Sequence, residues 1–366
     1  MRVLTLVGNR PQFVKAAAVS RVLRERHQEV LVHSGQHYDD ELSAVFFREL
    51  GVPSPDRELE VGSAPDGEQI GRIMHAFEAV AAHERCDIAL VYGDTNTTVA
   101  GALSCARLGI PLAHIEAGMR SFDHAMPEER NRVMTDHLSD VLLCSTEVAV
   151  ANLEREGISD GVELVGDVMA DVALAMAPLA RQRSGAPDRL GVEPGGYLLV
   201  TAHRAGNVDD PEALRTLVDV LVALPLPAVF PVHPRTRERL ADAGMLSELG
   251  RRESLILTEP LGYLDFLALL QGAAAVLTDS GGVQKEAYLA GVPCLTLRDT
   301  TEWTETVDLG WNRLVGLDRD LVLEALGAID PPAARPELYG GGRAAHAVVA
   351  VLERWVGRRV PIGAGP

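Results

Sequence analysis

The sequence predicts an α/β protein with two Rossmann-like, doubly wound parallel-sheet domains. Its 366 residues are too many for one compact core of ordinary size and suit two domains. Short, nearly continuous apolar runs, typical of strands covered on both faces, alternate with longer amphipathic stretches that are typical of helices. The alternation occurs in both halves of the chain. Strand–helix–strand successions imply right-handed crossovers and therefore a parallel sheet.

Strands and helices are expected in the same order in each half. In the first half, strands are predicted at 2–8, 29–35, 87–94 and 111–118, and helices at 13–26 and 97–109. In the second half, strands are predicted at 196–203 and 228–234, a helix at 209–224, and a strand–loop–helix–strand segment at 274–297. A stretch at 173–196 that is rich in Ala, Pro and Gly resembles a linker. We expect an N-terminal domain at 1–170, a C-terminal domain at 171–340, and a helix and tail at 341–366 that packs back on the N-terminal domain.

Composition excludes several classes of protein. The net charge of −18 argues against a general nucleic-acid binder, which needs a basic face, but a locally positive site for a small anion stays open. No apolar run is long enough to span a bilayer, and the N-terminus lacks the features of a signal peptide. The four cysteines do not have metal-ligand spacing. These features predict a cytoplasmic protein without a metal site or a membrane partner.

The candidate functional residues of the first half follow its strands, because ligands of open parallel sheets bind beyond the carboxyl ends of the strands. Arg10 and Lys15 lie at the start of the first predicted helix, which is either an anion site or a turn with exposed basic residues. Asp94 follows the strand at 87–94, where a single aspartate is more often a helix cap. Glu116 follows an apolar run, where a carboxylate is costly unless it has a partner or a task.

The second half offers an anion site after its strands. His203 follows the strand at 196–203, where a histidine can act as an acid or bind phosphate, although a single histidine is more often structural. Ser280, Gly281 and Gly282 open a helix whose backbone N–H groups would hold a phosphate, unless the glycines serve backbone geometry alone. Glu286, about a turn further on, could reach a ribose diol. Together the strand ends suggest a nucleoside diphosphate in a cleft between the domains, with its attached group against the acids of the first domain.

Ten motifs in order carry a resemblance to a known family. They are GNRPQ, SGQHYDD, GDTNTT, HIEAGMRS, PEERNR, VGD, TAHR, PVHP, TDSGGVQKEA and RDTTEW. With these motifs the sequence resembles the non-hydrolysing UDP-N-acetylglucosamine (UDP-GlcNAc) 2-epimerases. The resemblance implies a GT-B type fold, a homodimer, and a reaction that needs neither metal nor cofactor. In that reaction a base removes the C2 proton while UDP leaves C1; UDP then adds back to the 2-acetamidoglucal, giving UDP-N-acetylmannosamine (UDP-ManNAc).

The resemblance also implies a role for each matched residue. The acid/base carboxylates would be Asp94, Glu116 and Glu128, with the base not assigned among them, and His203 would stabilise or protonate the leaving UDP. The substrate contacts would be Arg10 and Lys15 for phosphate and sugar, Ser280, Gly281 and Gly282 for the diphosphate, Glu286 for the ribose, and Phe266 for the uridine. Gln36 and His233 match part of an allosteric UDP-GlcNAc site. A loop after Glu116 is expected to bring Glu128 to the sugar, with Arg120, Arg130 and Arg132 balancing the charge.

The sequence departs from the family pattern at three places. Gln12 stands where members commonly have an acid, Trp303 stands where an arginine is frequent, and after the predicted strand the chain reads HRAG (203–206) where many members read HRRE. Trp303 is expected to alter nucleotide contacts. Three other functions stay open: a hydrolysing relative that releases UDP and free N-acetylmannosamine, a glycosyltransferase on the same fold, and a non-catalytic nucleotide-sugar sensor.

Overall fold

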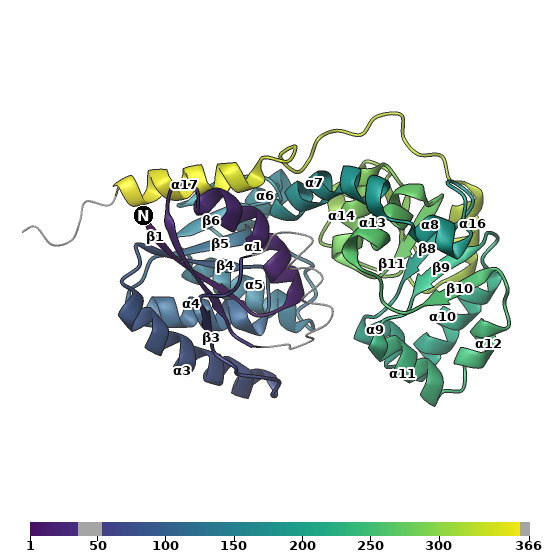
Figure 1. Ribbon diagram of the computed structural model, residues 1–366, viewed down its shortest axis with the longest axis horizontal. Helices are drawn as coiled ribbons and strands as arrows, with labels where there is room; N and C mark the ends of the chain where they lie inside the picture. The colour runs from purple at the N-terminus through teal and green to yellow at the C-terminus, as the bar shows by residue number, and fades with distance from the viewer. Residues whose placement is uncertain (36–52, 359–366) are drawn as a thin grey trace, which may run out of the picture. The chain divides into compact units, whose positions relative to one another are not determined.

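The computed structural model describes residues 1–35 and 53–358, which form two compact units (Figure 1). Unit 1 consists of Met1–Val172 together with the chain from Glu337 onward, and unit 2 is Ala173–Pro336. Each unit is built on its own sheet and is described by itself.

The sheet of unit 1 has seven strands in the order β3-β2-β1-β4-β5-β6-β7, and all of its strand pairs are parallel. The strands are β1 (Arg2–Val7), β2 (Gln28–His33), β3 (Arg57–Glu58), β4 (Ile88–Tyr92), β5 (Leu112–Ala117), β6 (Val141–Cys144) and β7 (Val162–Leu164). The helices between them are α1 (Arg10–Leu23), α3 (Asp66–Glu84), α4 (Asn96–Leu108), α5 (Pro127–Leu138) and α6 (Glu147–Arg155). Strands β1, β4 and β5 are almost wholly buried, which explains their continuous apolar sequence.

The sheet of unit 2 has six strands in the order β10-β9-β8-β11-β12-β13, again all parallel. The strands are β8 (Leu198–Thr201), β9 (Ala228–Pro231), β10 (Leu255–Thr258), β11 (Ala275–Thr278), β12 (Cys294–Thr296) and β13 (Asn312–Leu314). The helices are α8 (Ala186–Leu190), α9 (Ala205–Val208), α10 (Pro211–Ala223), α11 (Pro234–Asp242), α12 (Leu246–Gly250), α13 (Tyr263–Gly272), α14 (Gly281–Ala290), α15 (Thr304–Asp308) and α16 (Arg319–Gly327). Both sheets have the doubly wound strand order, so the predicted fold class is confirmed.

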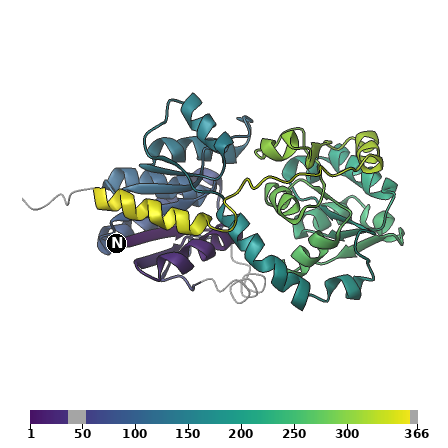
Figure 2. The same ribbon diagram turned by 90° about the horizontal axis from the view of Figure 1, so that it is seen from above.

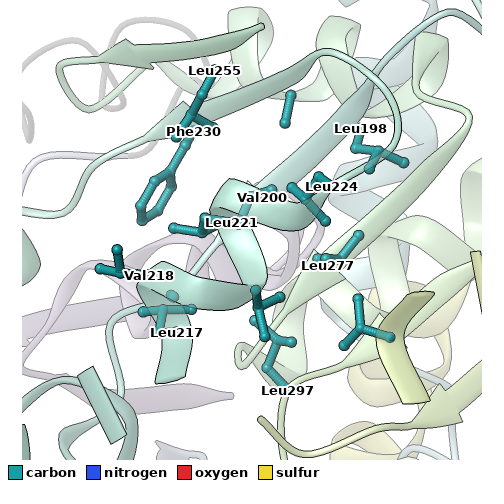
Figure 3. Close-up of a cluster of buried hydrophobic side chains, with 14 of the residues drawn as sticks. Leu198, Val200, Leu217, Val218, Leu221, Leu224, Phe230, Leu255, Leu277 and Leu297 are labelled. Atoms are coloured by element: carbon teal, nitrogen blue, oxygen red, sulfur yellow. The ribbon is translucent and has the colours of Figure 1, made fainter. Parts of the chain in front are cut away.

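The core of unit 2 shows how one helix is fixed to its sheet. Helix α10 begins where the sequence predicts, because the side chain of Asp210 caps it ahead of Pro211. Its Leu217 and Leu221 are fully buried among the side chains of β8, β9 and β11 (Figure 3). Burial of one such leucine contributes about 2 kcal/mol, so this face specifies where the helix packs.

The stretch at 173–196 is largely helical and not an extended linker. Helix α7 (Val168–Arg183) crosses the boundary between the units, and α8 follows it closely. The alanines explain the difference, because alanine has the highest helix propensity, and α7 includes Pro178 within its length.

The last helix, α17 (Ala344–Arg358), belongs to unit 1 and packs on α1 (Figures 1 and 2). Asp171 of α7 accepts hydrogen bonds from the backbone N–H groups of Ala344 and Ala345 at the start of α17. Towards its other end, Nε2 of His27 lies 2.7 Å from Oε1 of Glu353. The chain therefore returns to its first domain after completing the second.

Within the described ranges, no helix combines the length and apolar character that crossing a bilayer requires. The same residues contain no group of three or more His, Cys, Asp or Glu side chains arranged to hold a metal ion. Burial raises the pKa of Cys86 to about 11, and Cys105, Cys144 and Cys294 are buried free thiols.

Each sheet has one topological switch point, where the chain stops adding strands on one side of the first strand and begins adding them on the other side. It falls between β1 and β4 in unit 1 and between β8 and β11 in unit 2. Ligands of open parallel sheets bind beyond the carboxyl ends of the strands at this point. The residues that follow these four strands are therefore candidates for ligand contact.

Candidate active site

The loops after β1 and β4 are tied together by Gln12. Its side-chain nitrogen donates to the carbonyl oxygen of Tyr92 (2.7 Å) and to Oγ1 of Thr98 (2.9 Å). Its Oε1 accepts from the N–H of Gly8 (2.7 Å). A carboxylate here could not donate to the Tyr92 carbonyl, which only accepts. The departure from the family's acid therefore produces a neutral, fully buried crosslink between the two loops.

Glu116 has a strained backbone at the end of β5. Its φ of 72° lies in the left-handed region, which a glutamate rarely adopts, and the pairing of β5 with β6 is irregular between Ile115 and Ala117. Its carboxylate forms an ion pair with Lys15 of α1, and the two side chains are only 14% and 12% exposed. Gly93 leaves room for this pair, since a Cβ there would lie 3.1 Å from Nζ of Lys15. Such strain persists only where surrounding contacts impose it, and it is concentrated at functional sites.

Asp94 does not cap helix α4, so the interpretation favoured for an isolated aspartate is wrong. Thr95 is the cap, and it exchanges hydrogen bonds with Thr98. The Asp94 carboxylate instead lies 2.5 Å from Nη2 of Arg132 on α5. Its backbone carbonyl accepts from the side chain of Asn131 (3.0 Å). Side chains of helix α5 thus bind both the backbone carbonyl and the carboxylate of Asp94.

Glu128 lies in the first turn of α5 and not in a loop, because Pro127 starts the helix. Its side chain is exposed, whereas the next residue, Glu129, is buried. Glu129 accepts from the N–H groups of Ser121 (2.9 Å) and Phe122 (3.0 Å). Burial acts to raise the pKa of Glu129, but the bonds from Ser121, Phe122 and Arg132 hold it below the ordinary value. Sequence analysis did not assign a role to Glu129, which organises the loop ahead of α5.

The three arginines near these acids have different partners. Arg132 joins Asp94 to Glu129, as a charge-balancing role requires. Arg120 instead pairs with Asp136 (2.8 Å) and Glu156 (2.7 Å), neither of which is one of the three predicted carboxylates. Arg130 donates from Nε to the carbonyl oxygen of His124 (3.0 Å). Only Arg132 has the expected partner.

The structure thus brings Asp94 and Glu116 to the ends of neighbouring strands, each with a cationic partner. Glu128 is in the first turn of helix α5. Arg10 begins α1, but its side chain lies outside the described part, as does Gln36.

In unit 2, Asp279 fixes His203 across the switch point. Asp279 follows β11 and is completely buried, and its Oδ2 accepts from the N–H groups of His203 (2.8 Å) and Arg204 (2.9 Å). Its Oδ1 lies 3.5 Å from Nδ1 of His203, whose side chain is 39% exposed. Sequence analysis missed Asp279, although a carboxylate directly after an apolar strand is the same signal that identified Glu116.

The start of α14 has the form of an anion site. Ser280 is the N-cap residue, yet its side chain makes no capping hydrogen bond, so the first N–H groups of this ten-residue helix have no side-chain cap. Trp303 is buried beside this turn, and a Cβ on Gly281 would lie 3.0 Å from its Nε1. The Trp303 ring also covers Nζ of Lys285, 3.9 Å from the ring centroid. Trp303 therefore fills space against the start of α14.

The remaining predicted residues of unit 2 lie on neighbouring helices. Glu286 accepts a hydrogen bond from the hydroxyl of Tyr263 (2.9 Å). Burial raises the pKa of Tyr263, and the neighbouring charge of Glu286 raises it further. Phe266 of α13 packs half-buried on the core. His233 caps α11 and stacks on His203, with ring centroids 5.4 Å apart. Burial, followed by the charge of His203, lowers the pKa of His233.

The two switch points offer complementary chemistry. Unit 1 supplies carboxylates with cationic partners, which suits proton transfer. Unit 2 supplies a histidine and open helix N–H groups, which suit a phosphate.

Comparison with known proteins gives consistent matches. A family model described as UDP-N-acetylglucosamine 2-epimerase matches residues 21–353. The UDP-2,3-diacetamido-2,3-dideoxy-D-glucuronate 2-epimerase of Pseudomonas aeruginosa is 44% identical, over 97% of this chain and 100% of its own. The UDP-N-acetylglucosamine 2-epimerase of Methanocaldococcus jannaschii is 38% identical, over 96% of this chain and 99% of its own. A crystal structure of the M. jannaschii enzyme with UDP-GlcNAc and UDP has a TM-score of 0.90 and covers 97% of this chain and 100% of that one.

Proposed function

The chain belongs to the UDP-N-acetylglucosamine 2-epimerase family, and on this premise we propose that it interconverts UDP-GlcNAc and UDP-ManNAc. One structural observation carries the proposal: Glu116, strained and paired with Lys15, lies beside the Gly93–Asp94 turn at the switch point of unit 1. Backbone strain of this kind is concentrated at functional sites, which supports a role for Glu116 in the reaction.

The proposed reaction begins with removal of the C2 proton by one of the carboxylates Asp94, Glu116 and Glu128. The C–H electron pair forms the C1–C2 double bond, and the C1–O bond breaks toward the diphosphate, leaving 2-acetamidoglucal and UDP. In the second stage UDP adds back to C1, and another acid delivers a proton to the opposite face of C2. One residue cannot reach both faces, so the reaction needs at least two of these groups.

Unit 2 stabilises the leaving UDP in this proposal. Negative charge grows on the diphosphate as the C1–O bond breaks, and the N-terminus of α14 with Ser280, Gly281 and Gly282 offers N–H donors to it. His203, oriented by Asp279, donates to the same group. Glu286 would hold the ribose, Phe266 the uracil, and Arg10 and Lys15 the phosphate and sugar.

Other features are proposed on the family resemblance. They are a homodimer, a cytoplasmic location, independence from metals and cofactors, and an allosteric site that includes Gln36 and His233. Light scattering tests the dimer, and turnover in the presence of EDTA tests the metal. The allosteric site is tested by measuring whether added UDP-GlcNAc increases the rate at which UDP-ManNAc is converted.

A second substrate is supported by one relative. The P. aeruginosa protein named for UDP-2,3-diacetamido-2,3-dideoxy-D-glucuronate is more similar to this chain, at 44% identity, than the M. jannaschii enzyme at 38%. Its sugar undergoes inversion at the same carbon. The two substrates therefore have to be compared directly on this protein.

Proton NMR of the purified protein in D2O tests the proposal, with each UDP-sugar supplied separately. Deuterium at C2 and accumulation of UDP-ManNAc are expected from UDP-GlcNAc. Free N-acetylmannosamine and UDP would assign the chain to the hydrolysing class. Exchange only with the diacetamido-glucuronate would make that sugar the substrate, and no exchange with either sugar would overturn the epimerase proposal.

A further inference from the structure

His114, on β5, lies at the centre of a buried charged group that the proposed reaction does not use directly. Its ring is fully buried. Nε2 lies 2.7 Å from the carbonyl oxygen of Gly93, and Nδ1 lies 2.7 Å from Oδ1 of Asp136 on α5. Both are hydrogen-bond distances, so both ring nitrogens have a partner.

Both partners of the ring accept hydrogen bonds. A carbonyl oxygen has no proton to give, and an ionised carboxylate has none either. Asp136 also accepts from Arg120 (2.8 Å) and from the N–H of Gly118 (3.1 Å), and these donors favour its ionised form. A ring with a single proton would place a nitrogen lone pair against one of these oxygens. The His114 ring must therefore donate from both nitrogens, which makes it an imidazolium.

The charges around this ring balance. Asp136 also pairs with Arg120, and Arg120 pairs with Glu156, so two cations face two anions. Cys144 of β6 is the other titratable group beside Asp136, and burial, followed by Asp136, raises the pKa of its thiol. A compensated group of this kind tolerates burial, whereas removal of one member leaves a buried charge unpaired.

The group holds the backbone on both sides of Glu116. On one side, His114 binds the Gly93 carbonyl, and the N–H of Gly93 donates to the carbonyl oxygen of Ile115 (3.0 Å). On the other side, Oδ2 of Asp136 accepts from the N–H of Gly118 (3.1 Å). Gly93 precedes Asp94 directly. The same charged pair thus fixes the peptide that carries Asp94 and the strained segment that carries Glu116.

We propose that His114, which binds the Gly93 carbonyl and Asp136 through its two ring nitrogens, is a positioning residue that sets Asp94 and Glu116 for proton transfer. The proposal rests on the proposed function for its catalytic part, but the hydrogen bonds of His114 are independent of any substrate. Misplacement of a reacting group by about 1 Å can cost about 100-fold in rate, so the expected effect is large.

The first test is NMR of the full chain labelled with 15N-histidine, with the His114 ring assigned by correlation to its own backbone amide. Near neutral pH both ring nitrogens of His114 are expected to carry a proton, as donation to Asp136 and to the Gly93 carbonyl requires. A ring nitrogen without a proton would overturn the proposal. This result does not depend on whether the protein is an epimerase.

The second test compares His114→Gln with His114→Asn. A glutamine amide can reach the place of Nε2 and donate to Gly93, whereas an asparagine amide reaches only the place of Nδ1. We expect the asparagine variant to lose about 100-fold in kcat with little change in KM, and the glutamine variant to recover much of that loss. UDP affinity should change little in both variants, because most of the proposed UDP contacts lie in unit 2. Equal kcat in the two variants would contradict the positioning role, and if neither variant folds, the NMR result decides.

Discussion

The switch points of unit 1 and unit 2 follow strands in the same order, yet the side chains placed there differ in kind. Asp94 follows β4 and Glu116 lies near the end of the neighbouring β5, and each is paired with a basic side chain from a helix. His203 and Asp279 follow β8 and β11, and here the carboxylate is buried and binds the histidine. In the proposed reaction, the same fold therefore provides proton transfer in one unit and anion binding in the other, through the residues at its strand ends.

The difference extends to the backbone. Unit 1 holds a non-glycine residue, Glu116, in the left-handed region at the site, whereas every residue of unit 2 with positive φ is a glycine in the described ranges. Unit 2 instead offers an uncapped helix start at Ser280. Proton transfer needs a side chain at a fixed angle, while a phosphate needs only open N–H groups.

The largest effect is expected from Glu116→Gln. Loss of the carboxylate should lower kcat and the rate of C2 deuterium exchange by about 100- to 10,000-fold while UDP affinity stays unchanged. Glu60→Gln is a matched control, because Glu60 is also a glutamate with positive φ (51°) but is exposed and outside the site. If the Glu116→Gln variant bound UDP weakly yet kept its rate of C2 deuterium exchange, Glu116 would serve UDP binding and not proton transfer.

Asp279→Asn should reduce activity through His203. An amide would lose the charged contact with the His203 ring and with it the orientation of that ring, and we expect kcat to fall about 10- to 100-fold. Unlike the Glu116 variant, this one should also weaken UDP binding, measured by calorimetry. Intact UDP affinity with lower kcat would show that His203 acts on the sugar and not on the diphosphate.

Gly8→Ala tests the crowding of the unit 1 switch point. A Cβ at Gly8 would lie 2.5 Å from Oγ of Ser34 and closer still to Oγ1 of Thr97. The variant should lose about 1–3 kcal/mol of the free energy of unfolding, measured with urea. At the matched place in unit 2 the chain already has Ala202. Gly71→Ala is the control, since nothing lies near it in helix α3, and it should stabilise by about 0.5–1 kcal/mol.

The smallest effect concerns the acid stability of unit 1. The folded pKa of Glu129 lies below its ordinary value, so its contribution is present above the unfolded pKa and is lost as pH falls through the folded pKa. Glu129→Gln should therefore be less stable than the wild type near neutrality, and the difference should shrink below about pH 4.5. Urea unfolding at a series of pH values measures it. A difference that stays constant down to about pH 3 would mean that the charge of Glu129 adds nothing.

Sequence reasoning succeeded where the signal was local. The strands at the two switch points, and the residues after them, follow from apolar runs and from the rule that ligands bind at strand ends. It failed where neighbours in sequence compete: Thr95 and not Asp94 caps α4.

The sequence by itself determined two doubly wound domains, the family, and the strand ends that carry the candidate residues. These depend on periodicity and on ordered motifs, which are properties of short segments. Only the tertiary structure decided the partners: Asp94 with Arg132, His114 with Asp136, and His203 with Asp279. Members of these pairs lie 22 to 76 residues apart. Such pairs form because strand order and helix packing bring distant side chains together, and a local pattern does not contain that information.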